Sequence, residues 1–338
     1  MEDMYSILEE ISPDSSGSVL ATVIRVEGSA YKKAGASMLI KPDGTWTGLL
    51  SAGCLEEDLA ARIQAGLGRK PETVVYDMRS DDDLAWGTGS GCNGAIHIYI
   101  EPVDAGYAAH LLEFKQLLKN GTAVTGIKFL ASGTYLFITE DGKQFGSFQG
   151  ELDEDVVRCI RMKKGTFIFP AQQEEVYIRH YRPKPRFILF GAGKDAMPLC
   201  ALAAKAGFSV IVSDWRPGLC NRNHFPDADE IAAGFPAEVF TAGRITIHRD
   251  DYVMIMTHNF SRDQEILAYV LQKNPHYLGV LGSAKRTKRL LGTEKLPPGV
   301  RSPAGLSISA EGPEEIAISI VAECIQLKNG RVGEGVLI

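Results

Sequence analysis

One stretch in the second half of the chain restricts the fold more than any other. The short apolar run Phe187–Phe190 is followed at once by residues 191–196, with the sequence G-A-G-K-D-A. The apolar run predicts a strand and Asp195–Ala206 predicts a helix, so the glycines fall at a tight strand-to-helix turn. A G-x-G-x-x-A turn in this context is typical of the nucleotide-binding edge of a parallel α/β sheet.

The small residues of this turn have defined roles in the expected site. Gly191 permits the turn, Gly193 lets a pyrophosphate approach the amides at the helix N-terminus, and Ala196 lets the helix pack close to the strand. Asp214 ends the next predicted strand, where a carboxylate would meet a ribose hydroxyl. We therefore predict that these four residues bind a cofactor. The alternative is a glycine turn that binds nothing, and the motif specifies neither the ligand nor redox chemistry.

The rest of the second half alternates short β-rich runs with helical patterns. Such alternation predicts a parallel, doubly wound sheet of the Rossmann type. The further predicted strands are Ser209–Ser213, Tyr252–Met256 and Tyr277–Leu281, and the predicted helices are Asp263–Gln272, Lys285–Leu291 and Pro313–Leu327.

The turn after Tyr277–Leu281 should lie at the same edge of the sheet as the glycine-rich turn, because ligands of such sheets bind at the carboxyl ends of the strands. Gly282 lets the chain turn tightly, and Ser283 is predicted to cap the next helix. Lys285 and Arg286 follow and are predicted phosphate partners. The alternative for most of the basic residues in this helix is a solvated surface.

His258 lies just past the strand Tyr252–Met256, at the same expected edge. Its position makes it a candidate acid–base or cofactor-binding residue, with capping or lining of the crevice as an equal alternative. The sequence shows no paired acid–base constellation near this edge. That absence argues against a free-standing dehydrogenase.

The clearest domain boundary is the segment 181–185, with the sequence Y-R-P-K-P. Its two prolines fix the backbone as extended and remove two amide donors, so they predict a linker. A chain of 338 residues has the length of two domains. We therefore predict an N-terminal region over 1–182, a linker over 183–185 and a Rossmann-like domain over 186–338.

The N-terminal region has a mixed α+β pattern. The predicted strands are Val19–Val26, Thr73–Met78 and Ala95–Ile100, the predicted helices are Glu56–Leu67 and Tyr107–Lys119, and short strands within Val124–Phe148 are joined by a hairpin at Asp141-Gly142. The pattern leaves open whether residues 124–181 belong to this region or bridge to the next.

The composition is that of a globular protein, with 45% hydrophobic and 23% charged residues. A net charge of −6 and an isoelectric point near 5.7 argue against nucleic-acid binding. The acidic N-terminus does not fit a signal peptide, and no run reaches the roughly 18 apolar residues of a membrane span. We therefore expect a soluble cytoplasmic protein that binds neither nucleic acid nor membrane.

The six cysteines are too sparse for a disulfide scaffold, and we expect all of them to be reduced. Cys159, Cys200 and Cys324 have apolar neighbours and are predicted to be buried core thiols. Cys54 and Cys92 differ, because each lies in a glycine-rich turn. Glycines at that density are costly in backbone entropy, so such loops usually bring the backbone close to a ligand.

Cys54 lies at the start of the helix Glu56–Leu67, where the positive helix end favours the thiolate. Lys32 and Lys33, in the glycine loop 28–36, would add to this effect. A thiolate here would act as a nucleophile, a metal ligand or a sulfur carrier. We predict Cys54 as a catalytic and metal-binding residue and rank Cys92 second as a catalytic residue. The alternative is a small residue in a tight turn, and the spacing argues against structural zinc.

Together these motifs resemble the XdhC/CoxI family of accessory proteins. The resemblance covers about residues 19–327 and consists of several motifs in the family's order. It rests on the loop 28–36, the Gly53-Cys54-Leu55-Glu56 turn, the Gly91-Cys92-Asn93-Gly94 turn and, in the second half, the segments 191–193, 214–217, 256–259, 278–283, 303–306 and 311–323.

The resemblance implies a protein that binds molybdenum cofactor, as molybdopterin or its dinucleotide form. It further implies that the protein shields this cofactor during sulfuration by a cysteine desulfurase and inserts it into a xanthine dehydrogenase-type client enzyme. Two positions depart from the family pattern, both at expected ligand contacts. Ala52 stands where the family more often has glycine, and Lys194 stands where a histidine is expected.

Two other classes of function compete with this interpretation. One is an NAD(P)-dependent oxidoreductase that uses residues 191–196 and Asp214 for its cofactor, and the other is an interaction scaffold with a vestigial Rossmann site. We favour a cofactor-maturation chaperone over a free-standing enzyme. The client and the oligomeric state, for which a homodimer is one candidate, are left open by the sequence.

Overall fold

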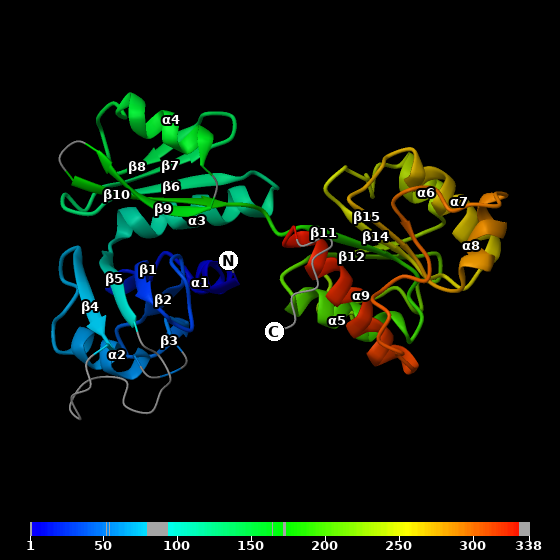
Figure 1. The fold of residues 1–338 in the computed structure, drawn as a ribbon, viewed down its shortest axis with the longest axis horizontal. Coiled ribbons are helices and arrows are strands. Elements are labelled where there is room, and N and C mark those ends of the chain that lie inside the picture. Colours follow the sequence, from blue (N-terminus) through cyan, green and yellow to red (C-terminus); the bar gives the residue numbers. More distant parts are fainter. Residues whose placement is uncertain are drawn as a thin grey trace. The chain divides into compact units, whose positions relative to one another are not determined.

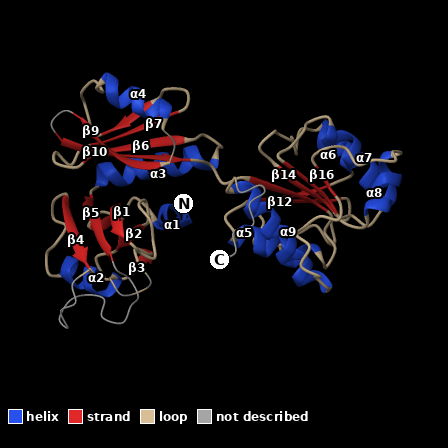
Figure 2. Cartoon of the chain, viewed as in Figure 1, coloured by secondary structure: helices blue, strands red, loops and turns tan. Residues whose placement is uncertain are grey.

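The computed structural model describes residues 2–51, 53, 55–79, 94–163, 165–171 and 174–330. The chain divides into two compact units, one extending to Pro183 and the other beginning at Lys184. The first unit contains two antiparallel sheets with their helices, and the second contains one parallel sheet with helices on both faces (Figure 1, Figure 2).

The first sheet has five antiparallel strands in the order β3-β2-β1-β5-β4. Alternate residues of the central strand face opposite sides, as the strand period requires. Val19, Ala21 and Val23 pack in a core with α2, and Leu20 packs in a core with α1 and α3. The elements are α1 (Glu2–Glu10), β1 (Ser18–Gly28), β2 (Ser37–Ile40), β3 (Trp46–Gly48), α2 (Glu56–Gln64), β4 (Glu72–Asp77) and β5 (Gly94–Val103).

The second sheet has the order β8-β7-β6-β10-β9 and is also antiparallel. The hairpin predicted at Asp141-Gly142 is confirmed, since it joins β7 to β8. Phe114 of α3 is fully buried in a core that contains residues of both sheets of this unit. The elements are α3 (Ala105–Lys119), β6 (Val124–Phe129), β7 (Tyr135–Thr139), β8 (Gln144–Gly146), α4 (Glu154–Met162), β9 (Thr166–Ala171) and β10 (Glu174–Tyr181).

The second unit is built on six parallel strands in the order β13-β12-β11-β14-β15-β16. This order and the helical connections confirm the predicted Rossmann-like doubly wound sheet. The elements are β11 (Arg186–Phe190), α5 (Ala196–Lys205), β12 (Ser209–Asp214), β13 (Glu230–Ala233), α6 (Pro236–Thr241), β14 (Tyr252–Ile255), α7 (Phe260–Leu271), β15 (Tyr277–Val280), α8 (Ala284–Leu291), β16 (Val300–Arg301) and α9 (Gly312–Lys328).

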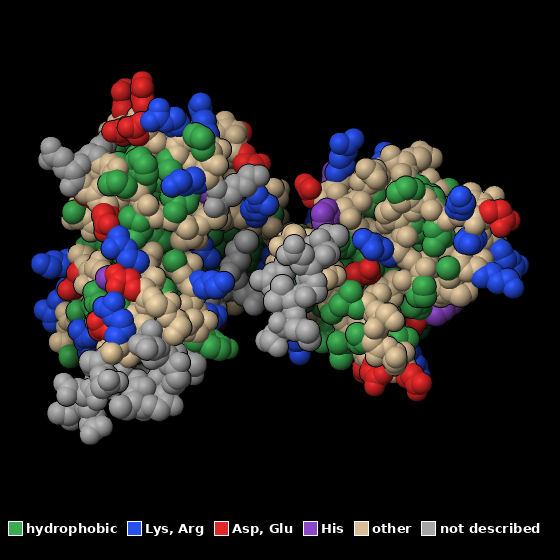
Figure 3. All heavy atoms as spheres, in the orientation of Figure 1, with side chains coloured by type: hydrophobic (Ala, Val, Ile, Leu, Met, Phe, Trp, Pro, Cys, Tyr) green, Lys and Arg blue, Asp and Glu red, His purple; other side chains and the backbone are tan. Residues whose placement is uncertain are grey.

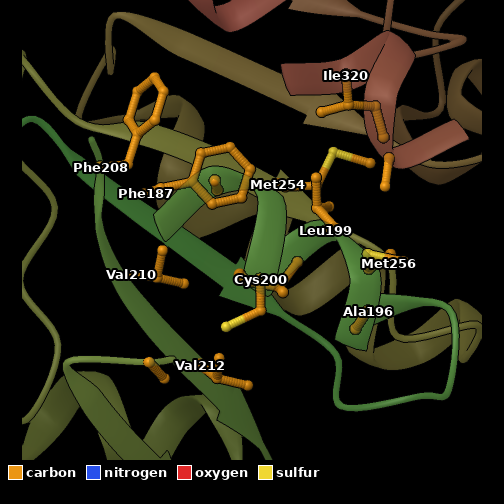
Figure 4. Close-up of a cluster of buried hydrophobic side chains, with 14 of the residues drawn as sticks. Phe187, Ala196, Leu199, Cys200, Phe208, Val210, Val212, Met254, Met256 and Ile320 are labelled. Carbon is orange, nitrogen blue, oxygen red and sulfur yellow. The ribbon is translucent and has the colours of Figure 1, made fainter. Parts of the chain in front are cut away.

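Each face of this sheet carries its own apolar core. Phe187 and Leu189 of β11 point into the core shared with α5 and α9, while Ile188 and Phe190 point into the core shared with α6, α7 and α8. Figure 4 shows the first of these cores, in which side chains of α5, such as Leu199 and Cys200, pack with side chains of the strands and with Ile320 of α9. A strand buried on both faces accounts for the uninterrupted apolar run in the sequence.

Several boundaries differ from the sequence predictions. The helix predicted from Asp263 begins at Phe260, because the side chain of Asn259 caps it by accepting a 3.1 Å hydrogen bond from the amide of Arg262. The helix predicted to reach Leu67 ends at Gln64. The elements α1, β2, β3, α4, β9, β10, β13, α6 and β16 were not predicted as such.

Charges of both signs are interspersed over the surface. On the face drawn in Figure 3, Lys and Arg side chains lie among Asp and Glu side chains on both units, without a continuous basic area. Among the helices that the structure describes, none is long and apolar enough to cross a membrane.

Candidate functional site

The candidate site lies at the carboxyl ends of β11 and β14. The chain passes from β11 to β12 on one side and later returns to β14 on the other side, so the winding of the sheet reverses between these two strands. Ligands of open α/β sheets bind in the crevice at such a switch point. Gly191 and Gly193 follow β11, His258 lies three residues after β14, and Asp214 is the last residue of β12.

Gly191 is required by the packing of the two strand ends. Its φ of +122° is unfavourable for any other residue, and a Cβ atom there would lie 2.5 Å from the carbonyl oxygen of Met256. Its amide donates a 2.8 Å hydrogen bond to the carbonyl oxygen of Ser213. Ala196 is fully buried against the strands, as the close packing of helix and strand predicts.

Gly193 has a different environment. A Cβ atom there would lie 2.5 Å from Oδ1 of Asp195, which is the end of a flexible side chain rather than backbone. The carboxylate of Asp195 therefore lies against the backbone that a pyrophosphate would approach. The predicted phosphate contact at Gly193 remains a prediction, and the nearby negative charge works against it.

Asp214 is buried and accepts four hydrogen bonds within the protein. Oδ2 accepts from the amide of Ala192 at 2.8 Å and from a guanidinium nitrogen of Arg216 at 2.7 Å. Oδ1 accepts from the amide and from Nε of Arg216, both at 2.9 Å. Burial raises the pKa of Asp214, but these hydrogen bonds outweigh it and hold the pKa below its usual range. A ribose hydroxyl, as predicted from the sequence, would have to compete with Arg216.

A paired acid–base group is present at the switch point, so the expectation that this edge has none is wrong. Nε2 of His258 lies 2.6 Å from Oδ2 of Asp195, although the two residues are 63 positions apart in the chain. The His258 side chain is 61% exposed and that of Asp195 is 24% exposed. His258 has a φ of 58°, a strained backbone conformation for a non-glycine residue and one that is common at functional sites.

The turn after β15 contains the remaining predicted residues. Gly282 has a φ of +112°, and Ser283 caps α8 by accepting a hydrogen bond from the amide of Arg286 at 3.3 Å, as predicted. The guanidinium of Arg286 forms a 2.5 Å ion pair with Asp263, whose side chain is almost completely buried. Arg286 would therefore have to leave Asp263 to meet a phosphate, whereas the side chain of Lys285 is exposed to solvent.

An apolar pocket of about 120 Å³ opens beside the Asp195–His258 pair. Its walls come from α5, from the residues after β14 and β15, and from the beginning of α9. The lining residues are Asp195, Leu199, Met256, Leu281, Gly312, Pro313, Ile316, Ala317 and Ile320. The sequence gives no direct signal of this pocket, because its walls come from four separate segments.

Both predicted reactive cysteines, Cys54 and Cys92, lie outside the described residues. Around Cys54, the described neighbours are held by Glu56, which the sequence did not single out as a site residue. Its Oε1 accepts hydrogen bonds from the amides of Leu50 and Ser51 at 2.9 and 2.7 Å, and its Oε2 accepts one from Oγ of Ser51 at 2.7 Å. Burial raises the pKa of Glu56, but the hydrogen bonds from Ser51 and Leu50 outweigh this effect and the net shift of the pKa is downward.

The first turn of α2 is acidic, which weakens the electrostatic support for a thiolate at Cys54. Glu56, Glu57 and Asp58 all lie in its first turn. Their carboxylates already compensate the positive end of the helix, so the thiolate at Cys54 remains a prediction with a weaker electrostatic basis. Within the described ranges, no three His, Cys, Asp or Glu side chains come together as a metal-binding group.

The fold defines a protein in which a mixed α+β unit is followed along the chain by a unit with a Rossmann-type parallel sheet. Comparison with protein families is more specific. Residues 187–324 match the XdhC Rossmann domain, residues 15–77 match the XdhC and CoxI family, and residues 105–182 match the BH1974-like central domain. The chain belongs to the XdhC and CoxI family.

Individual relatives extend over nearly the whole chain. It is 45% identical to a probable xanthine dehydrogenase subunit of Bacillus subtilis, over 97% of this chain and 98% of that protein. It is 23% identical to the molybdenum cofactor insertion chaperone PaoD of Escherichia coli, over 92% of this chain and 84% of that protein. A crystal structure of a xanthine dehydrogenase from Bacillus halodurans is 44% identical with a TM-score of 0.85, covering 99% of this chain and 98% of that one.

Proposed function

We propose that this chain binds molybdenum cofactor, protects it during sulfuration and inserts it into a molybdenum hydroxylase of the xanthine dehydrogenase type. The observation that carries the proposal is similarity over nearly the full length to a molybdenum cofactor insertion chaperone and to a protein named as a probable part of xanthine dehydrogenase. Its partners would be the client enzyme and a cysteine desulfurase, in the cytoplasm. In this role the chain is a maturation chaperone rather than a free-standing enzyme.

The residues at the switch point fit an anionic pterin. A phosphate reaches the backbone at Gly193 only after the side chain of Asp195, which is paired with His258, turns away from it. Lys285 is an exposed cation in the first turn of α8, at the carboxyl edge of the same sheet. Together these would hold a phosphate, with Gly191 fixing the loop that presents it. The cofactor itself supplies the metal on which hydroxylase chemistry depends.

Copurification tests the proposal directly. The intact chain should be produced in cells that make molybdenum cofactor, and then analysed for molybdenum by elemental mass spectrometry and for pterin by fluorescence after oxidation. Both should be found together with the folded protein. A preparation that carries neither, although a known carrier purified in parallel contains both, would contradict the proposal.

The role of Cys54 needs a separate comparison of two variants. Cys54→Ser should keep the fold and lose copurifying molybdenum if the thiolate holds the cofactor. Cys159→Ser is the matched control, because Cys159 is buried in α4 and should affect stability alone. Molybdenum per folded protein decides the outcome. If Cys54→Ser retains as much molybdenum as the wild type, the thiolate does not hold the cofactor, and the glycine turns would then contact it through their backbone alone.

An NAD(P)-dependent oxidoreductase is the second candidate, and the 2.6 Å contact of His258 with Asp195 is the observation that favours it. The four hydrogen bonds that already occupy Asp214 oppose a dinucleotide, because its ribose hydroxyl would have to displace Arg216. We expect no turnover of NAD(H) or NADP(H) with a panel of small substrates. Hydride transfer that His258→Gln abolishes would establish the oxidoreductase instead.

A further inference from the structure

The outer face of α9 carries an apolar stripe that is open to solvent. Ile318 is 50% exposed, Ile325 is 37% exposed, and the partly exposed Ala322 lies between them. Their spacings of four and three residues place these side chains on one side of the helix. The inner side is apolar as well, since Ile320 and Cys324 are fully buried against the sheet. A helix that is apolar on both sides is normally buried on both sides.

The neighbouring helix α5 extends this surface. It packs beside α9 over the same face of the sheet (Figure 1). Its residues 196–204 include no charged side chain, and Met197 and Ala201, one turn apart, are partly exposed. Continuous exposed apolar surface of this kind marks sites of protein interaction, whereas single exposed apolar residues do not.

The two ends of α9 carry charges of opposite sign. Glu314 lies in the first turn and Lys328 in the last, and both are exposed. With about 3.6 residues per turn, the two side chains lie on the same flank of the isoleucine stripe. Within the described residues no cation pairs with Glu314, and the ammonium of Lys328 donates a 3.2 Å hydrogen bond to the carbonyl oxygen of Ala206. A partner surface of a single charge sign would be repelled by one of these ends.

A second copy of α9, packed antiparallel, matches both the stripe and the charges. A two-fold axis brings each residue of one copy against a residue on the same flank at the opposite end of the other. With the axis near Ala322, Ile318 of one copy meets Ile325 of the other, and Glu314 meets Lys328. The small side chain of Ala322 lets the two helices approach at the centre. A parallel pair would instead place Glu314 against Glu314.

We infer that the outer face of α9 is the contact between two copies of this chain, which pack antiparallel about a two-fold axis near Ala322. The exposed side chains of α5 flank the contact. A stable interface buries about 800 Å² on each partner, which is more than the face of one helix supplies. The dimer should therefore be in reversible equilibrium with the monomer and dissociate on dilution.

Sedimentation of the intact chain tests the contact. The average mass of the wild type should rise from monomer toward dimer between about 1 and about 100 µM. Ile318→Asp should remain monomeric over this range, because a carboxylate at the contact would be buried opposite Ile325. Met162→Asp is the matched control, since Met162 is 78% exposed at the end of α4 in the first unit. Thermal unfolding should show that each variant is folded at the temperature of the measurement.

An exchange of charges tests the antiparallel arrangement. Glu314→Lys and Lys328→Glu should each raise the dissociation constant by about tenfold, because the affected pair occurs twice in the dimer. The double variant should return the constant to near the wild-type value. The two residues lie about 20 Å apart on one helix, so a loss of local structure at one end would not be reversed by the change at the other.

Cross-linking locates the two-fold axis. Ala322→Cys should join two chains through a short bismaleimide, with the link identified by peptide mapping and the wild type treated in parallel to account for native cysteines. Asn329→Cys is the control, because this exposed residue follows α9 and its two copies lie about 20 Å apart in an antiparallel pair.

Three results would overturn the inference. A wild-type chain that stays monomeric would leave the face of α9 to another occupant, such as a client protein. Dimerisation of Ile318→Asp as strong as that of the wild type would place the contact on another surface. A double charge variant no tighter than the single ones, or Asn329→Cys that cross-links as readily as Ala322→Cys, would exclude the antiparallel arrangement.

Discussion

The amide of Ala192 donates a 2.8 Å hydrogen bond to Oδ2 of Asp214, which ties the glycine-rich loop to the end of the neighbouring strand. The same carboxylate is held by the guanidinium of Arg216 in a bidentate arrangement. Because the carboxylate is fully buried and both of its oxygens are occupied, it fixes the shape of the loop before any ligand binds. In this fold, an acidic residue at the end of the second strand thus has a structural role beside any role in binding.

Asp214→Asn should lower the free energy of unfolding by about 2–3 kcal/mol at neutral pH, because hydrogen bonds to a charged group are lost. The folded-state pKa of Asp214 lies below its unfolded value, so its contribution is complete above the unfolded pKa and is lost as the pH falls through the folded pKa. The difference between variant and wild type should therefore shrink in acid, as measured by urea unfolding across pH. Asp227→Asn, at an exposed carboxylate, is the control. A difference that stays constant into acid would contradict this assignment.

The two glycines of the loop should respond differently to the same substitution. Gly191→Ala introduces a Cβ against the carbonyl of Met256 at a positive φ, so we expect a loss of more than about 2 kcal/mol of stability. Gly193→Ala meets only the end of the Asp195 side chain, so we expect a change within about 1 kcal/mol. Thermal and urea unfolding of the two variants measure this contrast. Comparable losses of stability in the two variants would contradict the expected difference between Gly191 and Gly193.

Three buried cysteines should be unreactive in the native protein. Burial raises the pKa of Cys200 to about 12 and that of Cys220 to about 11, and it raises the pKa of Cys324 as well. Because the thiolate is the reactive form, iodoacetamide at mildly alkaline pH should leave all three unmodified until the protein is denatured. Peptide mass mapping identifies the modified sites, and Cys54 is expected to react first. Rapid native modification of Cys200 would show that its surroundings open readily.

Much of the second unit could be predicted because its strands are short apolar runs bounded by glycine, proline and polar residues. The first unit was harder. Pro170 lies inside β9, and β10 carries charged residues such as Glu175 and Arg179, so neither has the usual alternation of a strand. Met4, Ile7 and Leu8 of α1 have helical spacing and are all buried, but the acidic residues on either side of them leave too short an apolar pattern to predict a helix.

The candidate site was predicted in its position but not in its contacts. The motif placed Gly191 and Asp214 at the sheet edge, since their spacing along the chain is fixed by strand and helix lengths. The pairing of Asp195 with His258 depends on the positive φ of His258 and on which strands are neighbours, and local sequence shows neither. The same holds for Arg286, whose partner Asp263 lies on a different helix.

The first unit contains an ion pair that is buried between two strands. Lys128 of β6 contacts the carboxylate of Glu101 of β5, and both side chains are only 5% exposed. Glu101 also accepts a 3.1 Å hydrogen bond from the hydroxyl of Tyr107. Removing one partner of a buried pair leaves an uncompensated charge, whereas replacing both with apolar residues of similar size is often neutral.

Glu101→Gln should therefore cost about 3–5 kcal/mol of stability, and the double variant Glu101→Leu, Lys128→Met should recover most of that loss. Burial, and after it the charge of Arg179, lower the pKa of Lys128 to about 7. In Glu101→Gln no carboxylate opposes these effects, so the pKa of Lys128 in the folded state lies below its value in the unfolded state. Above neutral pH the unfolded state therefore binds more protons than the folded state, and the stability of Glu101→Gln should rise with pH. Hydrogen exchange of peptides from β5 and β6 localises the change to this unit. A double variant no more stable than Glu101→Gln would show that packing around the pair, rather than its charges, sets the stability of this region.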